Sequence, residues 1–269
     1  MELDLHRNDG SILFSNSSQI QTTNGKRTSV VSSGYHHITG FKQLNSSHIV
    51  IVDHHDHCII MLKREDNSHA LLAGTCGASG FKDGQLAKFY YPYGVELDMR
   101  NPGHLLITDG NNNALRSVDV TSGTVSTVIR TGFKSPTGFT WYNGRLLVCN
   151  FLYYISEVTW TSDGTVTNNI LTGNRNRGYR DGAFTGAQFY HPIDIRQWRV
   201  GLFLVADQNN KRLRLLDMTN KKVLPVCIGS TTNCTTSTAL SFYPRSLLVS
   251  NNTIYVGAAY NGNVYKLVS

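Results

Sequence analysis

The side chains best suited to chemistry are a group of histidines, HHDH at residues 54–57 with His36 and His37 upstream. Imidazole and carboxylate groups of this kind are ligands for zinc or copper. Adjacent residues in a strand or tight turn point in different directions, so His54 and His55 are not expected to face one ion. We therefore predict exposed turn histidines, with no bound metal and no other cofactor.

The composition limits the class of protein but not its function. The chain of 269 residues has 16% charged and 40% hydrophobic residues, which is typical of a folded globular protein. A net charge of +7 permits binding to nucleic acid or to an anionic glycan, although no block of consecutive basic residues is present. No apolar run is long enough for a transmembrane helix, so we expect no membrane insertion by this segment.

A repeated pattern organises the chain. The segments HLLITDGNNNALRSVD (104–119) and LFLVADQNNKRLRLLD (202–217) share one template, in which Asp109 and Asp207 each close an apolar strand. Weaker copies place Asp53 and Asn150 at the same position, and outline copies lie near both ends of the chain. A spacing of about 48 residues suits propeller blades of four short strands.

The strand pattern predicts an all-β fold, a six-bladed β-propeller of four-stranded antiparallel blades. No segment has a helical period of useful length. The whole chain, 1–269, is predicted to be a single propeller domain, a piece of a larger protein whose flanking sequence supplies a missing outer strand. The predicted blades are 1–34, 35–79, 80–132, 133–177, 178–239 and 240–269.

The stretches GFKDG…AKFYYPYGVELD…LLITDGNNNALRSVD and GYRDG…AQFYHPIDI…LFLVADQNNKRLRLLD resemble NHL repeats. The resemblance implies a six-bladed propeller, but this fold carries enzymes, RNA binders and protein-binding modules alike. The strand-end aspartates are interpreted as structural residues that accept hydrogen bonds from the N–H groups of their own turns. Asp56, Asn112 and Asn210 are expected to assist them.

An enzymatic site finds little support. The zinc-binding lyase that resembles NHL proteins has histidines just after the proline that starts each inner strand, whereas this chain has Thr39, Tyr93 and Thr137 at such positions. Glu96 and Asp194 are the only obvious acids for a metal-dependent hydrolase, and no nucleophile or phosphate-binding motif fits its context. A hydrolase or lyase with a channel metal is kept as a second alternative.

One loop face is predicted to carry aromatic, histidine and arginine side chains. Tyrosine and arginine are enriched where proteins bind partners. No catalytic residue is assigned. The binding-face candidates are Tyr35, His36, His54, His55, Tyr93, Tyr153, Tyr154, Arg175, Arg177, Arg180, Tyr190 and Tyr260.

The cysteines bear on the compartment. If the hairpin after Cys58 turns near Asn67, Cys58 and Cys76 lie opposite each other within disulfide range. Cys227 and Cys234 are candidates for a second bridge, and Cys149 is expected to be a buried thiol. Two bridges favour an oxidising compartment, whereas a cytoplasmic chain would carry all five thiols reduced. The sequons at Asn16, Asn45, Asn233 and Asn251 are no more than chance predicts, so they do not decide the point.

The leading interpretation is a non-enzymatic binding module, extracellular or part of a secreted ectodomain, that holds a protein or glycan ligand. The alternative is an intracellular, cytoplasmic NHL propeller that binds RNA through Arg175, Arg177 and Arg180, with tyrosines for base stacking. The sequence does not identify the partner or the oligomeric state.

Overall fold

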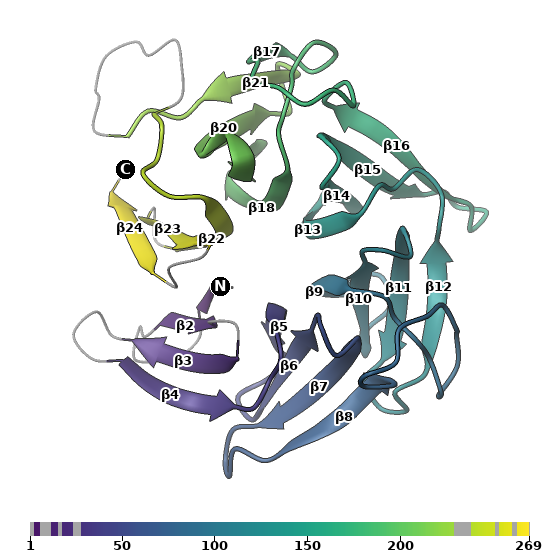
Figure 1. Ribbon diagram of the computed structural model, residues 1–269. Coiled ribbons are helices and arrows are strands. Elements are labelled where there is room, and N and C mark those ends of the chain that lie inside the picture. The colour runs from purple at the N-terminus through teal and green to yellow at the C-terminus, as the bar shows by residue number, and fades with distance from the viewer. Residues whose placement is uncertain are drawn as a thin grey trace. The chain divides into compact units, whose positions relative to one another are not determined.

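Six antiparallel sheets of three to five strands follow one another along the chain (Figure 1). Five of them are up-and-down meanders, and the fifth in chain order has one additional short strand at its outer edge. The computed structural model describes residues 3–5, 12–15, 18–23, 28–228, 238–250, 253–259 and 263–268. In this part of the chain the only helix is a short 3₁₀ turn at Gln208–Asn210. The sheets are propeller blades, so the predicted all-β, six-bladed β-propeller class is confirmed.

The first three blades are built from twelve strands. Blade one contains β1 (Leu3–Leu5), β2 (Ile12–Ser15), β3 (Gln19–Thr23) and β4 (Thr28–Ser33). Blade two contains β5 (Ile38–Gln43), β6 (His48–Asp53), β7 (Cys58–Lys63) and β8 (His69–Gly74). Blade three contains β9 (Pro92–Leu97), β10 (His104–Asp109), β11 (Ala114–Asp119) and β12 (Val125–Ile129).

The last three blades are more varied. Blade four contains β13 (Pro136–Tyr142), β14 (Arg145–Asn150), β15 (Tyr154–Trp160) and β16 (Val166–Thr172). Blade five has five strands, β17 (Gly182–Ala183), β18 (Pro192–Arg199), β19 (Leu202–Asp207), β20 (Arg212–Asp217) and β21 (Lys222–Pro225). The described part of blade six contains β22 (Pro244–Ser250), β23 (Thr253–Ala258) and β24 (Val264–Val268).

The chain divides into two compact units, Met1–Gly138 and Phe139–Ser269. In each unit, neighbouring blades meet through the strands that read as unbroken apolar runs. Val52, Leu105 and Ile107 belong to one core cluster that joins blades two and three. Phe203 and Val205 belong to another that joins blades four and five. These strands are covered on both faces, which explains why their sequences do not alternate.

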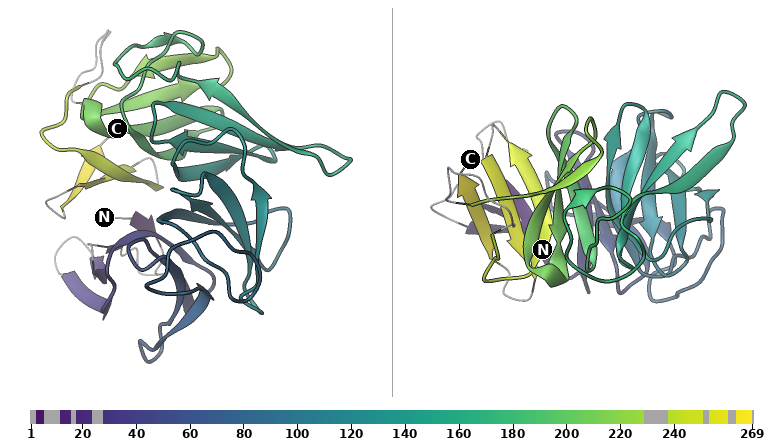
Figure 2. Two further views of the ribbon diagram at one scale, coloured as in Figure 1. Left: turned by 45° about the vertical axis from the view of Figure 1, so that its right-hand side comes forward. Right: turned by 90° about the horizontal axis from the view of Figure 1, so that it is seen from above.

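The successive colours in Figures 1 and 2 follow the blades in chain order, and the antiparallel strands of each blade lie side by side. The strand next to the innermost strand of a blade is buried along nearly its whole length, as β6, β10, β14 and β19 show. The fourth strand is more exposed, as in β8. No helix in the described residues has the length and apolar character needed to cross a membrane.

Candidate functional site

The strand-end aspartates fix the loops that lead into the inner strands. Asp109 accepts a 2.8 Å hydrogen bond from the backbone N–H of Tyr90, and Asp207 accepts one of 2.8 Å from Tyr190. Asp53 binds the corresponding loop of blade two. The carboxylates were expected to accept hydrogen bonds from the N–H groups of their own turns, whereas these donors lie 16 to 19 residues earlier in the chain. A loop held in this way presents its side chains in a fixed position.

Two buried arginines complete this framework in blades three and five. Arg116 and Asp109 are both fully buried, with 2.6 Å between Nη1 and Oδ2. Arg214 pairs with Asp207 in the same way at 2.8 Å. Each guanidinium also pairs with the aspartate of an Asp-Gly turn earlier in the chain, which is Asp83 for Arg116 and Asp181 for Arg214. A buried charge is tolerable only when it is paired and hydrogen-bonded, which this arrangement provides.

The same sites are closed by two amide side chains. The side-chain amide of Asn112 donates one hydrogen bond of 2.8 Å to Asp109 Oδ2 and another of 2.7 Å to the Gly80 carbonyl oxygen. Asn210 makes the equivalent bonds to Asp207 and Gly178. The structural interpretation of these residues is thus supported by their contacts. The buried arginines were missed in the sequence, although the arginine seven residues after the aspartate in both full repeats was a visible signal.

Blade two departs from this scheme. Ile60 occupies the place of the arginine, so the Asp53 carboxylate uses both oxygens on the loop, accepting 2.8 Å from His36 N–H and 2.9 Å from His37 N–H. Asp56 replaces the asparagine and pairs at 2.7 Å with Nδ1 of His36. This hydrogen bond raises the pKa of the exposed His36.

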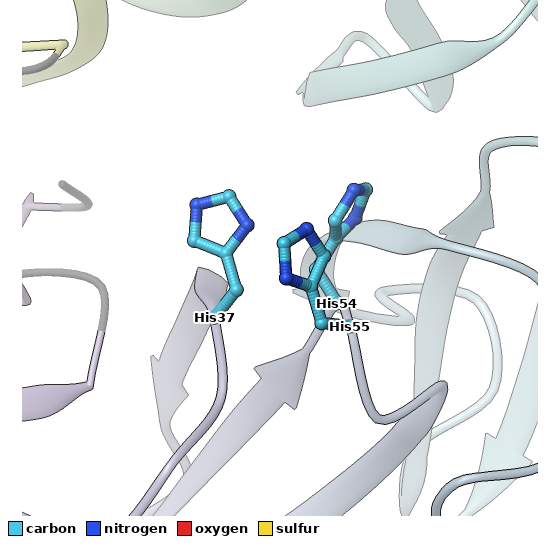
Figure 3. Close-up of side chains that lie close together, drawn as sticks. All are labelled: His37, His54 and His55. Carbon is cyan, nitrogen blue, oxygen red and sulfur yellow. The ribbon is translucent and has the colours of Figure 1, made fainter.

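The rings of His37, His54 and His55 gather beside one another (Figure 3). One ligand nitrogen from each lies within 4.8 Å of the others. His54 and His55 were expected to point in different directions, but the turn at residues 54–57 places a ring nitrogen of each near His37. His54 N–H also donates 2.8 Å to the His37 carbonyl oxygen, which fixes the two loops to each other.

The histidine turn also holds the loop that enters blade three. His57 Nδ1 accepts 3.2 Å from the backbone N–H of Tyr91, and His54 Nδ1 lies 2.9 Å from the Pro92 carbonyl oxygen. Burial lowers the pKa of His57, which favours the neutral ring that this acceptor role requires. Tyr93, a predicted face residue, is half-buried with its ring edge-on to His54, 5.7 Å between centroids.

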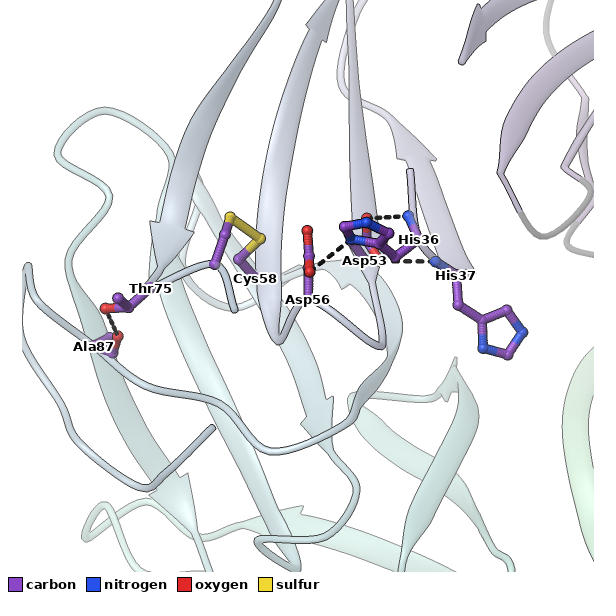
Figure 4. Close-up of a disulfide and its surroundings, with 8 residues drawn as sticks. His36, His37, Asp53, Asp56, Cys58, Thr75 and Ala87 are labelled. Carbon is purple, nitrogen blue, oxygen red and sulfur yellow. Dashed lines mark hydrogen bonds and ion pairs between the residues drawn. A yellow bond between two sulfur atoms is a disulfide. The ribbon is translucent and has the colours of Figure 1, made fainter. Parts of the chain in front are cut away.

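A disulfide lies beside the histidine loops (Figure 4). Cys58 and Cys76 are bonded with 5.1 Å between their Cα atoms, which confirms the predicted bridge. Cys149 is a buried free thiol, as expected. Cys227 is also disulfide-bonded, and its expected partner Cys234 lies outside the described residues.

A second group of rings lies on blades four and five and forms what we call the aromatic platform: Phe151, Tyr153, Tyr190 and His191. The His191 ring stacks on Phe151 at 3.7 Å and is nearly parallel to Tyr153 at 5.5 Å between centroids. Tyr190 meets His191 at 4.7 Å. The Asn209 amide lies 2.8 Å from His191 Nδ1, and burial lowers the pKa of His191, so the platform is uncharged at neutral pH.

The predicted face residues divide by exposure. His36, His55, Arg175, Arg177 and Arg180 are exposed, whereas His54, Tyr93, Tyr153 and Tyr190 are half-buried. Tyr35 and Tyr154 differ from the expectation, because both are buried. Tyr35 bonds Ser32, and the Tyr154 ring is covered by the guanidinium of Arg175 at 5.5 Å. Tyr260, together with the sequons at Asn16, Asn233 and Asn251, lies outside the described residues.

The two acids considered for catalysis have structural partners. Glu96 pairs with Lys42 at 2.8 Å. Asp194 is buried and accepts 2.7 Å from Leu247 N–H and 2.9 Å from Ile195 N–H. These contacts join β18 to β22, so the Asp194 carboxylate holds two inner strands together.

No model of a known protein family matches the sequence, and no curated protein matches it. Solved structures do resemble the chain in fold. An auxiliary nutrient binding protein from Bacteroides ovatus has a TM-score of 0.78 at 14% identity, over 99% of this chain and 68% of that one. A chain of a nidogen/laminin complex has a TM-score of 0.66 at 14% identity, over 95% and 88%. Virginiamycin B lyase from Staphylococcus aureus has a TM-score of 0.61 at 16% identity, over 99% and 79%. At such identities the likeness shows the β-propeller fold alone.

Proposed function

We propose that the chain is an NHL-type propeller that acts as a non-enzymatic, extracellular binding module. The observation that carries the proposal is the aromatic platform, in which half-buried rings are held by a fixed framework and leave part of their surface to solvent. The Cys58–Cys76 disulfide supports an oxidising compartment. The nutrient-binding and laminin-complex propellers are precedents for a binding role on this fold.

The chemistry of the platform favours a glycan as the partner. The face of an aromatic ring carries negative charge, so it attracts the C–H groups on the apolar side of a sugar ring. Arg175 and Arg177, exposed in the loop that follows blade four, add positive charge for carboxylate or sulfate groups. Arg175 covers Tyr154, the residue after Tyr153, so this charge lies close to the platform.

The test is binding of tag-free secreted protein to a panel of neutral and sulfated glycans, with heparin and a stem-loop RNA as anionic probes. We expect a glycan to bind, and Tyr153→Ala and the Arg175→Ala/Arg177→Ala pair to weaken the binding at least about tenfold. Leu152→Ala, an exposed change in the same turn, and Arg64→Ala are the matched controls.

The other outcomes of the panel separate the competing functions. Binding to RNA alone, with a steep salt dependence that flattens in the double arginine variant, would establish the intracellular RNA-binding alternative instead. Release of product from any glycan or lactone would establish an enzyme. Equal binding by wild type and Tyr153→Ala would remove the platform from the account.

A further inference from the structure

The loops of blade two contain more histidines than the corresponding loops of the two full repeats, in which His191 of blade five is the one histidine. Where blade three has Tyr90 and Tyr91 before its inner strand, blade two has His36 and His37. After the strand-end aspartate, blade three continues with Gly110 and Asn111, and blade two with His54 and His55. At each of these four positions blade two has a histidine, and three of the four imidazole rings lie close together in the structure.

The framework positions these rings before any ligand arrives. Asp53 holds the backbone of His37 by a 2.9 Å hydrogen bond, and the His37 carbonyl oxygen accepts 2.8 Å from His54 N–H. The Cys58–Cys76 disulfide anchors the other end of the turn that carries His54 and His55 (Figure 4). Because both loops are fixed, little ordering of the backbone is needed for the three rings to act together.

The tautomer of His54 suits a metal ligand. Its Nδ1 lies 2.9 Å from the Pro92 carbonyl oxygen, which can only accept, so Nδ1 carries the hydrogen and Nε2 carries the lone pair. A histidine that donates its other ring N–H to a backbone carbonyl is the usual arrangement around protein-bound metals, because it orients the ring and increases the basicity of the ligand.

The donor set selects the class of ion. Neutral imidazoles suit zinc, copper and nickel, whereas calcium and magnesium require oxygen ligands. Nitrogens at 2.0–2.1 Å from a tetrahedral zinc ion lie about 3.4 Å apart. The three ligand nitrogens are already within 4.8 Å of one another, and the exposed side chain of His55 has room to rotate inward.

We propose that His37, His54 and His55 bind one Zn²⁺ ion, with a fourth coordination position open to water or to a donor group of a ligand. The rings of Tyr91 and Tyr93 lie next to His54, with centroids 4.8 Å and 5.7 Å from that of His54. The three histidines belong to blade two, whereas the aromatic platform belongs to blades four and five. Zinc binding is therefore tested independently of glycan binding.

A neighbouring group, His36 with Asp53 and Asp56, is the main competitor for the ion. Both oxygens of Asp53 already accept backbone hydrogen bonds, and Asp56 is paired with His36. Binding there would require these contacts to break. Zinc binding by His37, His54 and His55 leaves these contacts of Asp53 and Asp56 in place, so the imidazole group is the preferred site.

The experiment is calorimetric titration of Zn²⁺ into tag-free protein pretreated with a chelator, followed by Co²⁺ titration monitored by visible absorption. We expect one ion per chain and a Co²⁺ spectrum typical of nitrogen ligands. His37→Ala and His55→Ala should each weaken Zn²⁺ affinity about 100-fold, and Asp53→Asn, which removes no ligand, about tenfold. His69→Ala, an exposed histidine of the same blade, is the control and should leave the affinity unchanged.

Three results would overturn the proposal. The first is absence of stoichiometric Zn²⁺ binding by wild-type protein. The second is equal affinity in wild type and His37→Ala, provided that both have the same melting temperature. The third is loss of binding in His36→Ala but not in His55→Ala, which would assign the ion to the competing group. His55→Ala changes an exposed side chain, so the test does not depend on a variant that fails to fold.

Discussion

The carboxylate of Asp53 accepts a hydrogen bond of 2.9 Å from the backbone N–H of His37, 16 residues before it in the chain. Equivalent hydrogen bonds join the backbone N–H of Tyr90 to Asp109 and that of Tyr190 to Asp207. In each of these repeats the strand-end aspartate therefore fixes the backbone of the loop that leads into the inner strand. The side chains of these loops differ between blades, with histidines in blade two, tyrosines in blade three, and Tyr190 and His191 in blade five.

The buried ion pair of blade three should be essential for stability. Arg116→Met leaves the buried Asp109 carboxylate without its charge partner, so we expect a loss of about 3 to 5 kcal/mol in the free energy of unfolding. Urea denaturation measures this change. Lys63→Ala, which breaks an ion pair with exposed Glu65, should cost no more than about 1 kcal/mol. Similar losses in the two variants would contradict the structural role of Arg116.

The blade-two disulfide should stabilise the fold by restricting the unfolded chain. The bridge links residues separated by 18 positions, so the Cys58→Ser/Cys76→Ser variant should lose about 2 to 4 kcal/mol. Denaturation of this variant and wild type, both without reductant, measures the difference. Recovery of two additional free thiols from the unfolded wild-type protein would show instead that the bridge does not form.

The close approach of β5 to β9 should tolerate no side chain at Gly40. A Cβ atom there would lie 2.6 Å from the Tyr93 carbonyl oxygen, so Gly40→Ala must push the two inner strands apart. We expect a cost of about 1 to 3 kcal/mol, measured by thermal or urea unfolding. Gly186→Ala is the control, because its nearest atom, the Ala183 carbonyl oxygen, is 3.9 Å away. A neutral Gly40→Ala would show that the strands are less tightly packed.

Tyr154 should make stability depend on pH in the alkaline range. Burial raises its pKa to about 12, against about 10 for an unfolded tyrosine. The folded protein thus holds this proton more tightly, and the resulting stability is complete below about pH 10 and is lost as the pH rises toward 12. Burial also raises the pKa of Tyr35, so NMR of ring-labelled tyrosine should show late-titrating resonances, one of which Tyr154→Phe removes. If the resonance that Tyr154→Phe removes titrates near pH 10, the burial of this ring is contradicted.

The architecture was predictable because the repeat is written twice in nearly complete form. The end of each apolar strand at Asp109 and Asp207 fixed the strand limits, and the hairpin register then placed Cys58 opposite the residues near Cys76. The charged Arg116 and Arg214 lie in alternating strands, where an arginine normally faces solvent. Besides Asp109 and Asp207, each arginine binds an aspartate 33 residues away, Asp83 or Asp181, and this second contact is not revealed by a local pattern.

The sequence indicated which types of residue the loops carry, but it did not indicate which of their side chains are exposed and lie together. The loops that carry Tyr153 and Tyr190 do bring their rings together, whereas Tyr154 begins a buried strand and turns inward. The histidine group was underestimated because adjacent side chains at 54–57 were expected to point in different directions, in a turn as in a strand. Turn conformation depends on the hydrogen bonds of both flanking loops, which a single sequence does not specify.

The central claim is that a rigid repeat framework presents exchangeable loop side chains for binding. The most direct measurement is a paired determination of melting temperature and glycan affinity for wild type and the Tyr153→Ala/His191→Ala variant, with the glycan identified on the panel. The account predicts that affinity falls at least about tenfold while the melting temperature changes by no more than a few degrees. Unchanged affinity, or a loss that merely follows unfolding of the variant, would contradict it.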